Sequence, residues 1–193
     1  TSTDPDSQIY HENFEDNSYD GTTTTATIVN MVGHTDELTN VLYTQVSNSY
    51  KWKQQYTVGE IHTISFWYKH VDSGTYILDL RNETANSGQV LAIQTDGTNI
   101  TCLDYGNAKD ENLYINGVEV SSATYIITDW NHYCLTVSDE YIDNIYWGHT
   151  GYQGGAHLIY QTNGYFDDVR FFNEVLTGNQ IADLAAGNNG NSG

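Results

Sequence analysis

Acidic side chains gather in two segments of the sequence that could hold a divalent cation. Glu15, Asp16 and Asp20 follow one another closely near the start of the chain, and Asp167 and Asp168 are adjacent near its end. Calcium prefers roughly six to eight oxygen ligands, which carboxylates and carbonyls of two loops can supply. These five residues are therefore the candidate metal ligands. The competing interpretation is a solvated acidic edge in which one aspartate accepts a hydrogen bond from a backbone amide.

A loop rich in glycine, aromatic and imidazole side chains is the candidate carbohydrate site. Sugars stack on flat aromatic rings, and amide or imidazole groups can hydrogen-bond their hydroxyls. Loops on a rigid scaffold are also where recognition residues concentrate. The expected contact residues are Trp147, His149, Tyr152, Gln153 and His157. The competing interpretation is that Trp147 and Tyr152 pack over the edge of a sheet and the loop binds no ligand.

The sequence contains no pattern typical of a catalytic site. Glycoside hydrolases need two carboxyl groups that face one cleft. The nearest segment is 139–143, where Asp139 and Glu140 would point to opposite faces of an extended strand. A zinc-peptidase spacing of histidines, a phosphate-binding loop and a dinucleotide-binding glycine pattern are all absent from the sequence. We therefore expect a protein that is not an enzyme.

The chain has two cysteines, Cys102 and Cys134, each within a segment typical of a strand. If the two strands are neighbours, the cysteines could form a disulfide, which would fit an oxidising compartment. The alternative is two buried thiols, because cysteine also behaves as a small apolar residue. The sequence leaves both interpretations open.

The charge balance excludes several kinds of partner. Acidic residues outnumber basic residues by 25 to 6, and the formal net charge is −19. Nucleic acids and anionic membranes require clusters of Lys and Arg, so neither is an expected partner. Divalent cations remain compatible with the charge. No run of about 18 apolar residues is present, so membrane insertion is not expected either.

Short segments with alternating polar and apolar residues dominate the chain. They are separated by clusters of Gly, Asn, Asp and Ser, which is typical of an antiparallel sandwich or barrel. Asp96-Gly97 and Asn116-Gly117 predict hairpin turns. The expected strands are 26–32, 41–46, 61–70, 76–81, 90–95, 99–105, 113–115, 125–128, 132–138, 141–147 and 164–172.

Two segments give the clearest local predictions. In 61–70, Ile64, Phe66 and Tyr68 share one face and should lie in the core, whereas Thr63, Ser65, Trp67 and Lys69 share the other. In the closing strand, strict alternation would place Asp167 and Asp168 on opposite faces, so that only one would bind an ion. A short helix is expected at 177–186, because Thr177 and Gln180 form a capping box and Gly187 is a typical stop.

Four segments resemble the laminin-G-like and concanavalin A-like lectin group. The closing stretch resembles its ending G-x-x-D-D-V-R-x-x-x-x-x-L-T/S-x-x-x-I, and 61–70 resembles its f-t-I-s-x-W-x-k strand. Residues 113–120 resemble the hairpin L-Y-V-N-G-x-x-V, and 130–137 resemble the strand W-H-H-V-A-L-T. The resemblance spans 9–187, which is taken as one domain. Residues 1–8 are expected to be a linker or cloning remnant, and 188–193 a flexible tail.

The resemblance implies an all-β, two-sheet antiparallel jelly-roll sandwich of the concanavalin A-like kind with one short C-terminal helix. In such sandwiches the first strand pairs near the last, which would bring the two acidic segments together around a structural calcium ion. The implied function is non-catalytic recognition of a glycan or glycoprotein by an extracellular module of a larger adhesin, cell-surface or virion-surface protein. The alternative is a structural or assembly domain that contacts other protein subunits.

Overall fold

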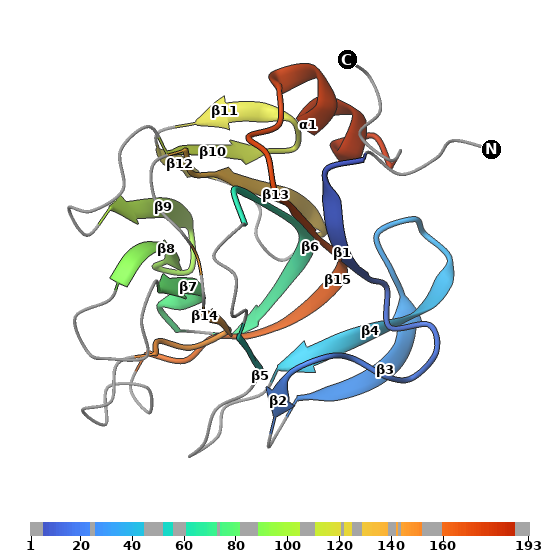
Figure 1. The fold of residues 1–193 in the computed structure, drawn as a ribbon. Coiled ribbons are helices and arrows are strands. Elements are labelled where there is room, and N and C mark those ends of the chain that lie inside the picture. The colour runs from blue at the N-terminus through green and yellow to red at the C-terminus, as the bar shows by residue number, and fades with distance from the viewer. Residues whose placement is uncertain are drawn as a thin grey trace.

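Two antiparallel β-sheets pack face to face and one short helix follows the last strand (Figure 1). This arrangement confirms the predicted all-β sandwich. The computed structural model describes residues 6–23, 26–44, 52–55, 61–72, 74–81, 89–104, 111–120, 122–124, 129–138, 142, 144–151 and 160–187.

The first sheet, sheet A, has the strand order β11-β10-β13-β6-β15-β4-β3. The strand β1 also pairs with β15, next to its C-terminal half, whereas β4 pairs with its N-terminal half. The bounds are β1 Gln8–Glu12, β3 Thr27–Val32, β4 Leu38–Thr44, β6 Thr63–Asp72, β10 Asn112–Ile115, β11 Val118–Val120, β13 Asn131–Thr136 and β15 Asn163–Phe172. The first strand therefore pairs with the last, as the family resemblance implied.

The second sheet, sheet B, has the order β12-β9-β8-β7-β14-β5-β2. Its strands are β2 Thr22–Thr23, β5 Trp52–Gln55, β7 Tyr76–Arg81, β8 Gln89–Thr95, β9 Asn99–Asp104, β12 Ser122–Thr124 and β14 Asn144–Trp147. Both predicted hairpins are present, between β8 and β9 and between β10 and β11. In the second, Asn116 and Gly117 have φ angles of 52° and 80°, which a type I′ turn requires.

The core lies between the two sheets and is rich in aromatic rings. Ile64, Phe66 and Tyr68 of β6 are fully buried, which confirms the face predicted for this strand. From sheet B, Trp52 and Trp147 stack with their ring centroids 4.9 Å apart. Trp147 also meets the ring of Phe66 edge to face at 5.2 Å. The other faces of the sheets are consequently free for polar residues or for covering segments.

The helix α1 (Gly178–Ala185) covers part of the outer face of sheet A. Its capping box is present as predicted, since Thr177 accepts from the Gln180 amide and the Gln180 side chain accepts from the Thr177 amide. Its buried residues Ile181 and Leu184 pack in a small cluster with Cys134 of β13. The hairpin of Gly117 also approaches the helix, because an added Cβ there would lie 3.0 Å from the Cα of Ala182. Within the described residues no helix has the length and hydrophobicity that crossing a membrane requires.

A β-bulge interrupts β15 at the predicted acidic pair. Asp167 pairs with Trp67 of β6 and Arg170 pairs with Ser65, so two residues of β15 face one residue of β6. Asp168 occupies the left-handed region with φ 47°. The extra residue resets the alternation, and Asp167, Asp168 and Arg170 all point to the outer face. The expectation that the two aspartates lie on opposite faces is therefore wrong.

Several strands have no counterpart in the sequence-based expectation. The strands β1, β2 and β5 have the sequences QIYHE, TT and WKQQ, which show little apolar alternation. They form because a neighbouring strand offers backbone hydrogen bonds, which the local sequence does not encode. The short strand β12 was also not expected, and the strand expected at 125–128 lies outside the described residues.

Candidate functional site

The predicted carbohydrate loop begins with residues that belong to the interior. Trp147 is fully buried, and its Nε1 donates to Oε1 of Gln54 at 2.8 Å. His149 is also fully buried, with Nδ1 2.9 Å from the carbonyl oxygen of Trp147. Neither ring can present a face to a sugar, so their assignment as contact residues is corrected. Trp147 follows the alternation of β14 into the core between the sheets, whereas the competing interpretation placed it over the edge of a sheet. Tyr152, Gln153 and His157 lie outside the described residues.

The three acidic residues near the start of the chain accept hydrogen bonds from groups of the protein itself. Oε1 of Glu15 accepts from the backbone amide of Asn40 at 3.0 Å and from the hydroxyl of Thr39. Oδ1 of Asp16 accepts from the hydroxyl and the amide of Ser18, and these bonds lower the pKa of the Asp16 carboxyl. Asp20 contributes its backbone oxygen, which accepts from Nε1 of Trp52 at 2.7 Å.

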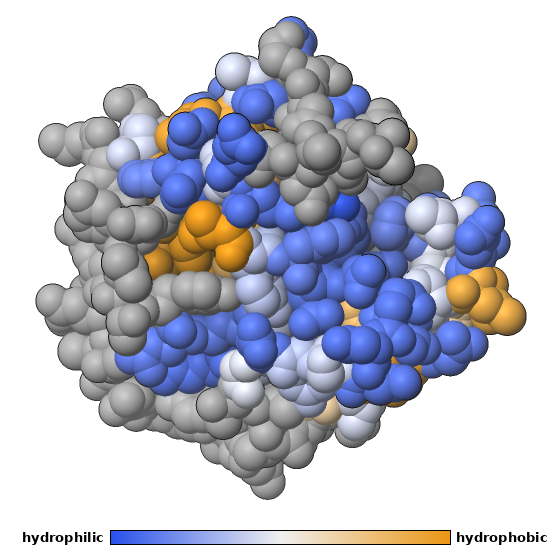
Figure 2. Space-filling model, turned by 45° about the vertical axis from the view of Figure 1, so that its right-hand side comes forward, coloured by the Kyte–Doolittle hydropathy of each residue, from blue (hydrophilic) through white to orange (hydrophobic). Residues whose placement is uncertain are grey.

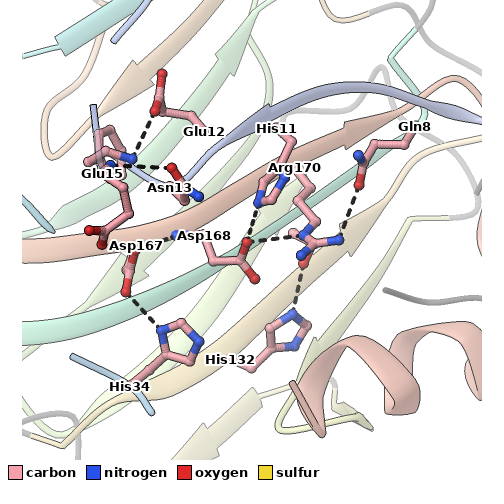
Figure 3. Close-up of polar contacts among 12 residues, drawn as sticks. Gln8, His11, Glu12, Asn13, Glu15, His34, His132, Asp167, Asp168 and Arg170 are labelled. Atoms are coloured by element: carbon pink, nitrogen blue, oxygen red, sulfur yellow. Dashed lines mark hydrogen bonds and ion pairs between the residues drawn. The ribbon is translucent and has the colours of Figure 1, made fainter. Parts of the chain in front are cut away.

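The two aspartates of the bulge are each paired with a histidine (Figure 3). Oδ2 of Asp167 lies 2.8 Å from Nδ1 of His34, on the turn between β3 and β4, and its Oδ1 accepts from the Asp168 amide at 2.8 Å. Oδ1 of Asp168 lies 2.5 Å from Nε2 of His11 on β1 and accepts from Nε of Arg170 at 3.1 Å. The bulge thus ties two segments of the N-terminal region to the last strand.

The environments of the two aspartates shift their pKa values in opposite directions. Burial raises the pKa of Asp167, and the hydrogen bond from His34 only partly opposes this effect. Burial also acts to raise the pKa of Asp168, but the bond from His11 and the charge of Arg170 outweigh it and hold that pKa at about 2. Asp168 therefore remains ionised at neutral pH as the centre of a charged network.

These residues do not fit the predicted calcium ion. In the ranges described above, no group of three or more His, Cys, Asp or Glu side chains is arranged to hold a metal. The oxygens of Asp167 and Asp168 instead face N–H donors and a guanidinium, which compete with a cation for the same lone pairs. The calcium ion stays a prediction that these carboxylates do not support.

A buried serine–histidine pair on the same face lacks the features of a catalytic dyad. Oγ of Ser65 lies 2.7 Å from Nε2 of His132, and both residues are almost fully buried. Burial lowers the pKa of His132 to about 3, so the ring is neutral and a weak base. Nδ1 of His132 has no hydrogen-bond partner within the described chain, whereas a catalytic histidine needs an orienting group there. The pair packs the sheet and offers no access to a substrate.

Next to the Asp167–His34 pair lies an aromatic hollow of about 370 Å³. Its aromatic lining comes from His34, Trp67 of β6 and Trp130, which directly precedes β13. The imidazole of His34 stacks on the Trp67 ring with 4.5 Å between centroids and 14° between planes, and it meets the Trp130 ring at 6.4 Å and 70°. Nε1 of Trp130 donates to the Val32 carbonyl at 3.3 Å. This aromatic hollow is the candidate binding site.

Charged side chains line the same hollow. The carboxylates belong to Asp36 on the β3–β4 turn and to Asp129 in the segment before β13. The ammonium group belongs to Lys69 on β6. Hydroxyl-rich ligands need both hydrogen-bond donors and acceptors beside an apolar surface, and this set supplies them. The sequence contained one signal of the site: Trp67 is a large aromatic residue on the polar face of an alternating strand. The contributions of His34 and Trp130 could not be inferred, because pairing of distant segments brings them to Trp67.

Two other hollows lack this combination in their described linings. One of about 420 Å³ lies where β9 approaches β10 and β11, and Glu111, Glu119 and Cys102 line it. Another of about 240 Å³ is lined by polar residues such as Gln94 and Asn99. Neither has an aromatic ring among its described lining residues. The aromatic hollow on sheet A is therefore better suited to bind a ring-shaped ligand.

The two cysteines do not meet the condition for the predicted disulfide. Cys102 lies on β9 in sheet B and Cys134 on β13 in sheet A, so their strands are not neighbours. Both remain thiols. Burial raises the pKa of Cys134, which packs under α1 as an apolar side chain. Cys134 therefore fits the alternative of a buried thiol, whereas Cys102 is only half-buried.

Comparisons with known proteins give only distant likeness. No protein-family model and no curated protein matches the chain. Among solved structures it is similar to the botulinum neurotoxin serotype G binding domain, with 13% identity, a TM-score of 0.45 and coverage of 87% of this chain and 46% of that one. It is also similar to a botulinum neurotoxin type G receptor binding domain, with 10% identity, a TM-score of 0.47 and coverage of 93% of this chain and 51% of that one. This chain spans about half of those domains, and such values transfer neither a site nor a function.

Proposed function

We propose that this domain is a non-catalytic carbohydrate-recognition module and that the glycan binds in the aromatic hollow on sheet A. The observation that supports this most directly is the cluster of His34, Trp67 and Trp130 beside the charged side chains of the same hollow. An aromatic face offers the apolar side of a sugar ring a flat contact surface. Carboxylates at the rim can accept hydrogen bonds from sugar hydroxyls.

The resemblance to laminin-G-like and concanavalin A-like domains agrees with this function. It favours an extracellular module of a larger adhesin, cell-surface or virion-surface protein. The net charge of −19 opposes contacts with nucleic acid or with anionic lipid headgroups. Glycans and glycoproteins are the partners that remain most compatible with the hollow and with the charge.

A glycan array followed by calorimetry with each array hit tests the proposal. The Trp130→Ala variant should lose at least about tenfold in affinity, because stacking on one aromatic ring contributes this much to a small ligand. Its fold should survive, since Trp130 is only half-buried. A matched control is Tyr160→Ala, which removes an aromatic residue that is 42% exposed and does not line the hollow. Unchanged affinity in Trp130→Ala would place any binding elsewhere and contradict the proposed site.

The same array, repeated with a chelator, tests the calcium ion expected from the sequence. Because Asp167 and Asp168 are already bonded to His34, His11 and Arg170, we expect the hits to persist without calcium. Loss of every hit in chelator, with recovery on adding calcium, would instead support a calcium-dependent lectin.

One observation favours the assembly alternative. Val32 and Leu38 pair across the end of the β3–β4 hairpin and are 50% and 73% exposed. They form a small apolar tip. Among the coloured residues of Figure 2, the hydrophobic ones form separate patches beside hydrophilic ones. Light scattering after gel filtration decides whether the domain self-associates. A monomer that binds glycans excludes self-assembly as the main function.

A further inference from the structure

We infer that the aromatic hollow selects sugars that present hydrogen-bond donors, above all cationic amino sugars. This inference rests on the proposed function and names the chemical class of its ligand. Its basis is the orientation of His34, combined with the charges around the hollow.

The position of His34 is fixed by a stacking contact and a hydrogen bond. Its ring lies flat on Trp67, and Nδ1 lies 2.8 Å from Oδ2 of Asp167. The β3–β4 turn can lie this close to Thr39 and Asp167 because residue 33 is glycine. A Cβ added at Gly33 would lie 2.2 Å from Cγ2 of Thr39 and 3.3 Å from Oδ2 of Asp167. A side chain held in this way presents one defined atom to a ligand.

The hydrogen bond to Asp167 determines which nitrogen of His34 carries the proton. When Asp167 is ionised, its carboxylate only accepts hydrogen bonds, and Nδ1 of His34 is then the donor. In the neutral ring Nε2 then has a lone pair and acts as an acceptor. Nε2 of His34 has no hydrogen-bond partner within the described residues. The ring therefore offers an acceptor, which suits a hydroxyl or an ammonium group.

The charges of the hollow favour a cation over an anion. Asp36 and Asp129 oppose a single Lys69 among the described lining residues, and Asp167 lies directly behind His34. The ring faces of Trp67 and Trp130 add attraction for a cation, because the face of an indole carries negative charge density. The overall charge of −19 acts in the same direction. A sialylated or sulfated sugar would meet repulsion in this environment.

Three tetrasaccharides that share a β-1,4 backbone test the inference. They are cellotetraose, the tetramer of N-acetylglucosamine and the tetramer of glucosamine, which differ only in the group at C2. Calorimetry at low salt and at pH 7 should give the glucosamine tetramer about tenfold higher affinity than cellotetraose. The advantage should shrink at high salt, because exposed carboxylates are screened. Equal affinities, or preference for the acetylated tetramer, would overturn the inference.

Non-specific attraction to an acidic protein needs its own control. Trp130→Ala keeps every charge but removes one wall of the hollow. It should lose binding of the glucosamine tetramer, whereas Tyr160→Ala should bind it like the native protein. If Trp130→Ala binds the glucosamine tetramer as well as the native protein does, the attraction is only that of the net charge and the inference is wrong.

The Asp167→Asn variant tests the part played by His34. Oδ1 of Asp167 already accepts from the Asp168 amide, so the amide oxygen should stay there and the new NH₂ group should face Nδ1. The proton of His34 would then move to Nε2, which would become a donor. ¹⁵N chemical shifts of the imidazole report this change without any sugar. The preference for the glucosamine tetramer over cellotetraose should fall in the variant. A native protein with Nε2 protonated at neutral pH would contradict the argument.

The results separate this inference from the proposed function. Array hits limited to neutral or anionic glycans, lost in Trp130→Ala, would retain the carbohydrate site and overturn the preference for amino sugars. No binding of any arrayed glycan or of the three tetramers would overturn both.

Discussion

Asp79 and Asp167 occupy comparable places on the two sheets but have opposite surroundings. Each projects from the outer face of its sheet, and burial raises the pKa of each carboxyl group. Asp79 in sheet B is fully buried, and its Oδ2 accepts from Nε of Arg81 at 3.2 Å, Oγ1 of Thr150 at 2.9 Å and the Gly151 amide at 2.7 Å. Asp167 in sheet A instead supports the wall of an open hollow through His34.

The difference between these regions arises from the segments that cover them. After β14 the chain turns back over sheet B, and Gly151 lies so close that an added Cβ would be 2.7 Å from Nε of Arg81. Sheet A is covered by α1 at one end, and the β3–β4 turn borders its hollow. A buried carboxylate that accepts from an N–H donor is therefore sealed inside the structure where a segment covers the sheet, and it borders an open hollow where the sheet stays uncovered.

The largest expected effect comes from breaking the sealed pair. Arg81→Met keeps most of the side-chain volume but leaves the buried Asp79 carboxylate without its counter-charge. Loss of one partner of a buried ion pair costs about 3 to 5 kcal/mol of unfolding free energy. Urea denaturation at pH 7 measures this loss of unfolding free energy in Arg81→Met. Lys69→Met, which removes a half-buried cation from the open region, should change stability by less than about 1 kcal/mol.

The pH dependence of Arg81→Met provides a second measurement on that variant. Burial raises the folded-state pKa of Asp79 above its unfolded-state pKa. The protonated carboxyl therefore contributes stability that is present below the unfolded-state pKa and is lost as pH rises through the folded-state pKa. The loss of unfolding free energy in Arg81→Met, relative to the native protein, should therefore be smallest near about pH 4 and largest at neutral pH. A deficit independent of pH would mean that lost packing, and not the uncompensated carboxylate, causes the instability.

A smaller effect is expected from the charged network of the open face. Asp168→Asn removes the charge, and asparagine tolerates the left-handed backbone at φ 47°. The pKa of Asp168 is lowered from 3.8 to about 2, which corresponds to about 2 kcal/mol of stability at pH 7. Because the folded pKa is depressed, this contribution is present above pH 3.8 and disappears as pH falls towards 2.

Asp36→Asn is the matched control for this measurement. Asp36 has a similar φ of 62° but is exposed, and it forms no ion pair with any residue that the structure describes, so its substitution should leave stability nearly unchanged. Chemical denaturation of both variants between pH 7 and pH 2 makes the comparison. If Asp168→Asn and Asp36→Asn behave alike, the bonds of Asp168 to His11 and Arg170 do not stabilise the fold.

The smallest effect concerns the helix that covers the other part of sheet A. Thr177→Ala removes the capping side chain of α1 and should cost about 1 kcal/mol. Thr177→Ser keeps the hydroxyl and should restore most of this loss. Thermal unfolding followed by circular dichroism measures both variants. Glycan affinity should not change in either, because α1 does not line the aromatic hollow; a parallel loss of affinity would show that the two parts of the face are coupled.

Features that depend on neighbouring residues in the chain were predictable. The alternation of Ile64, Phe66 and Tyr68 set the core face of β6, and Asn116-Gly117 set a hairpin. Thr177 and Gln180 marked the start of α1. Each of these depends on backbone preferences or on a side-chain period within a few residues. The number and spacing of such segments indicated an antiparallel sandwich or barrel, and the family resemblance implied the two-sheet sandwich.

The site residues were less predictable, because their roles depend on distant pairing. Trp147 and His149 have the chemistry of a sugar site, but the alternation of β14 and the cover over sheet B bury them. Asp167 and Asp168 came to the same face only because the register against β6 left one residue of β15 unpaired. No local pattern distinguishes such a bulge from regular alternation.

The sequence by itself determined that this chain forms short strands and a capped helix, that it carries strong negative charge and that an aromatic residue, Trp67, stands on a polar strand face. Only the tertiary structure decided which side chains meet. It placed His34 between Trp67 and Asp167, brought Trp130 to the same hollow and sealed Asp79 under a covering segment. The physical reason is that strand propensity and charge are local properties, whereas a binding hollow depends on the register between strands far apart in the sequence and on which sheet face is left uncovered.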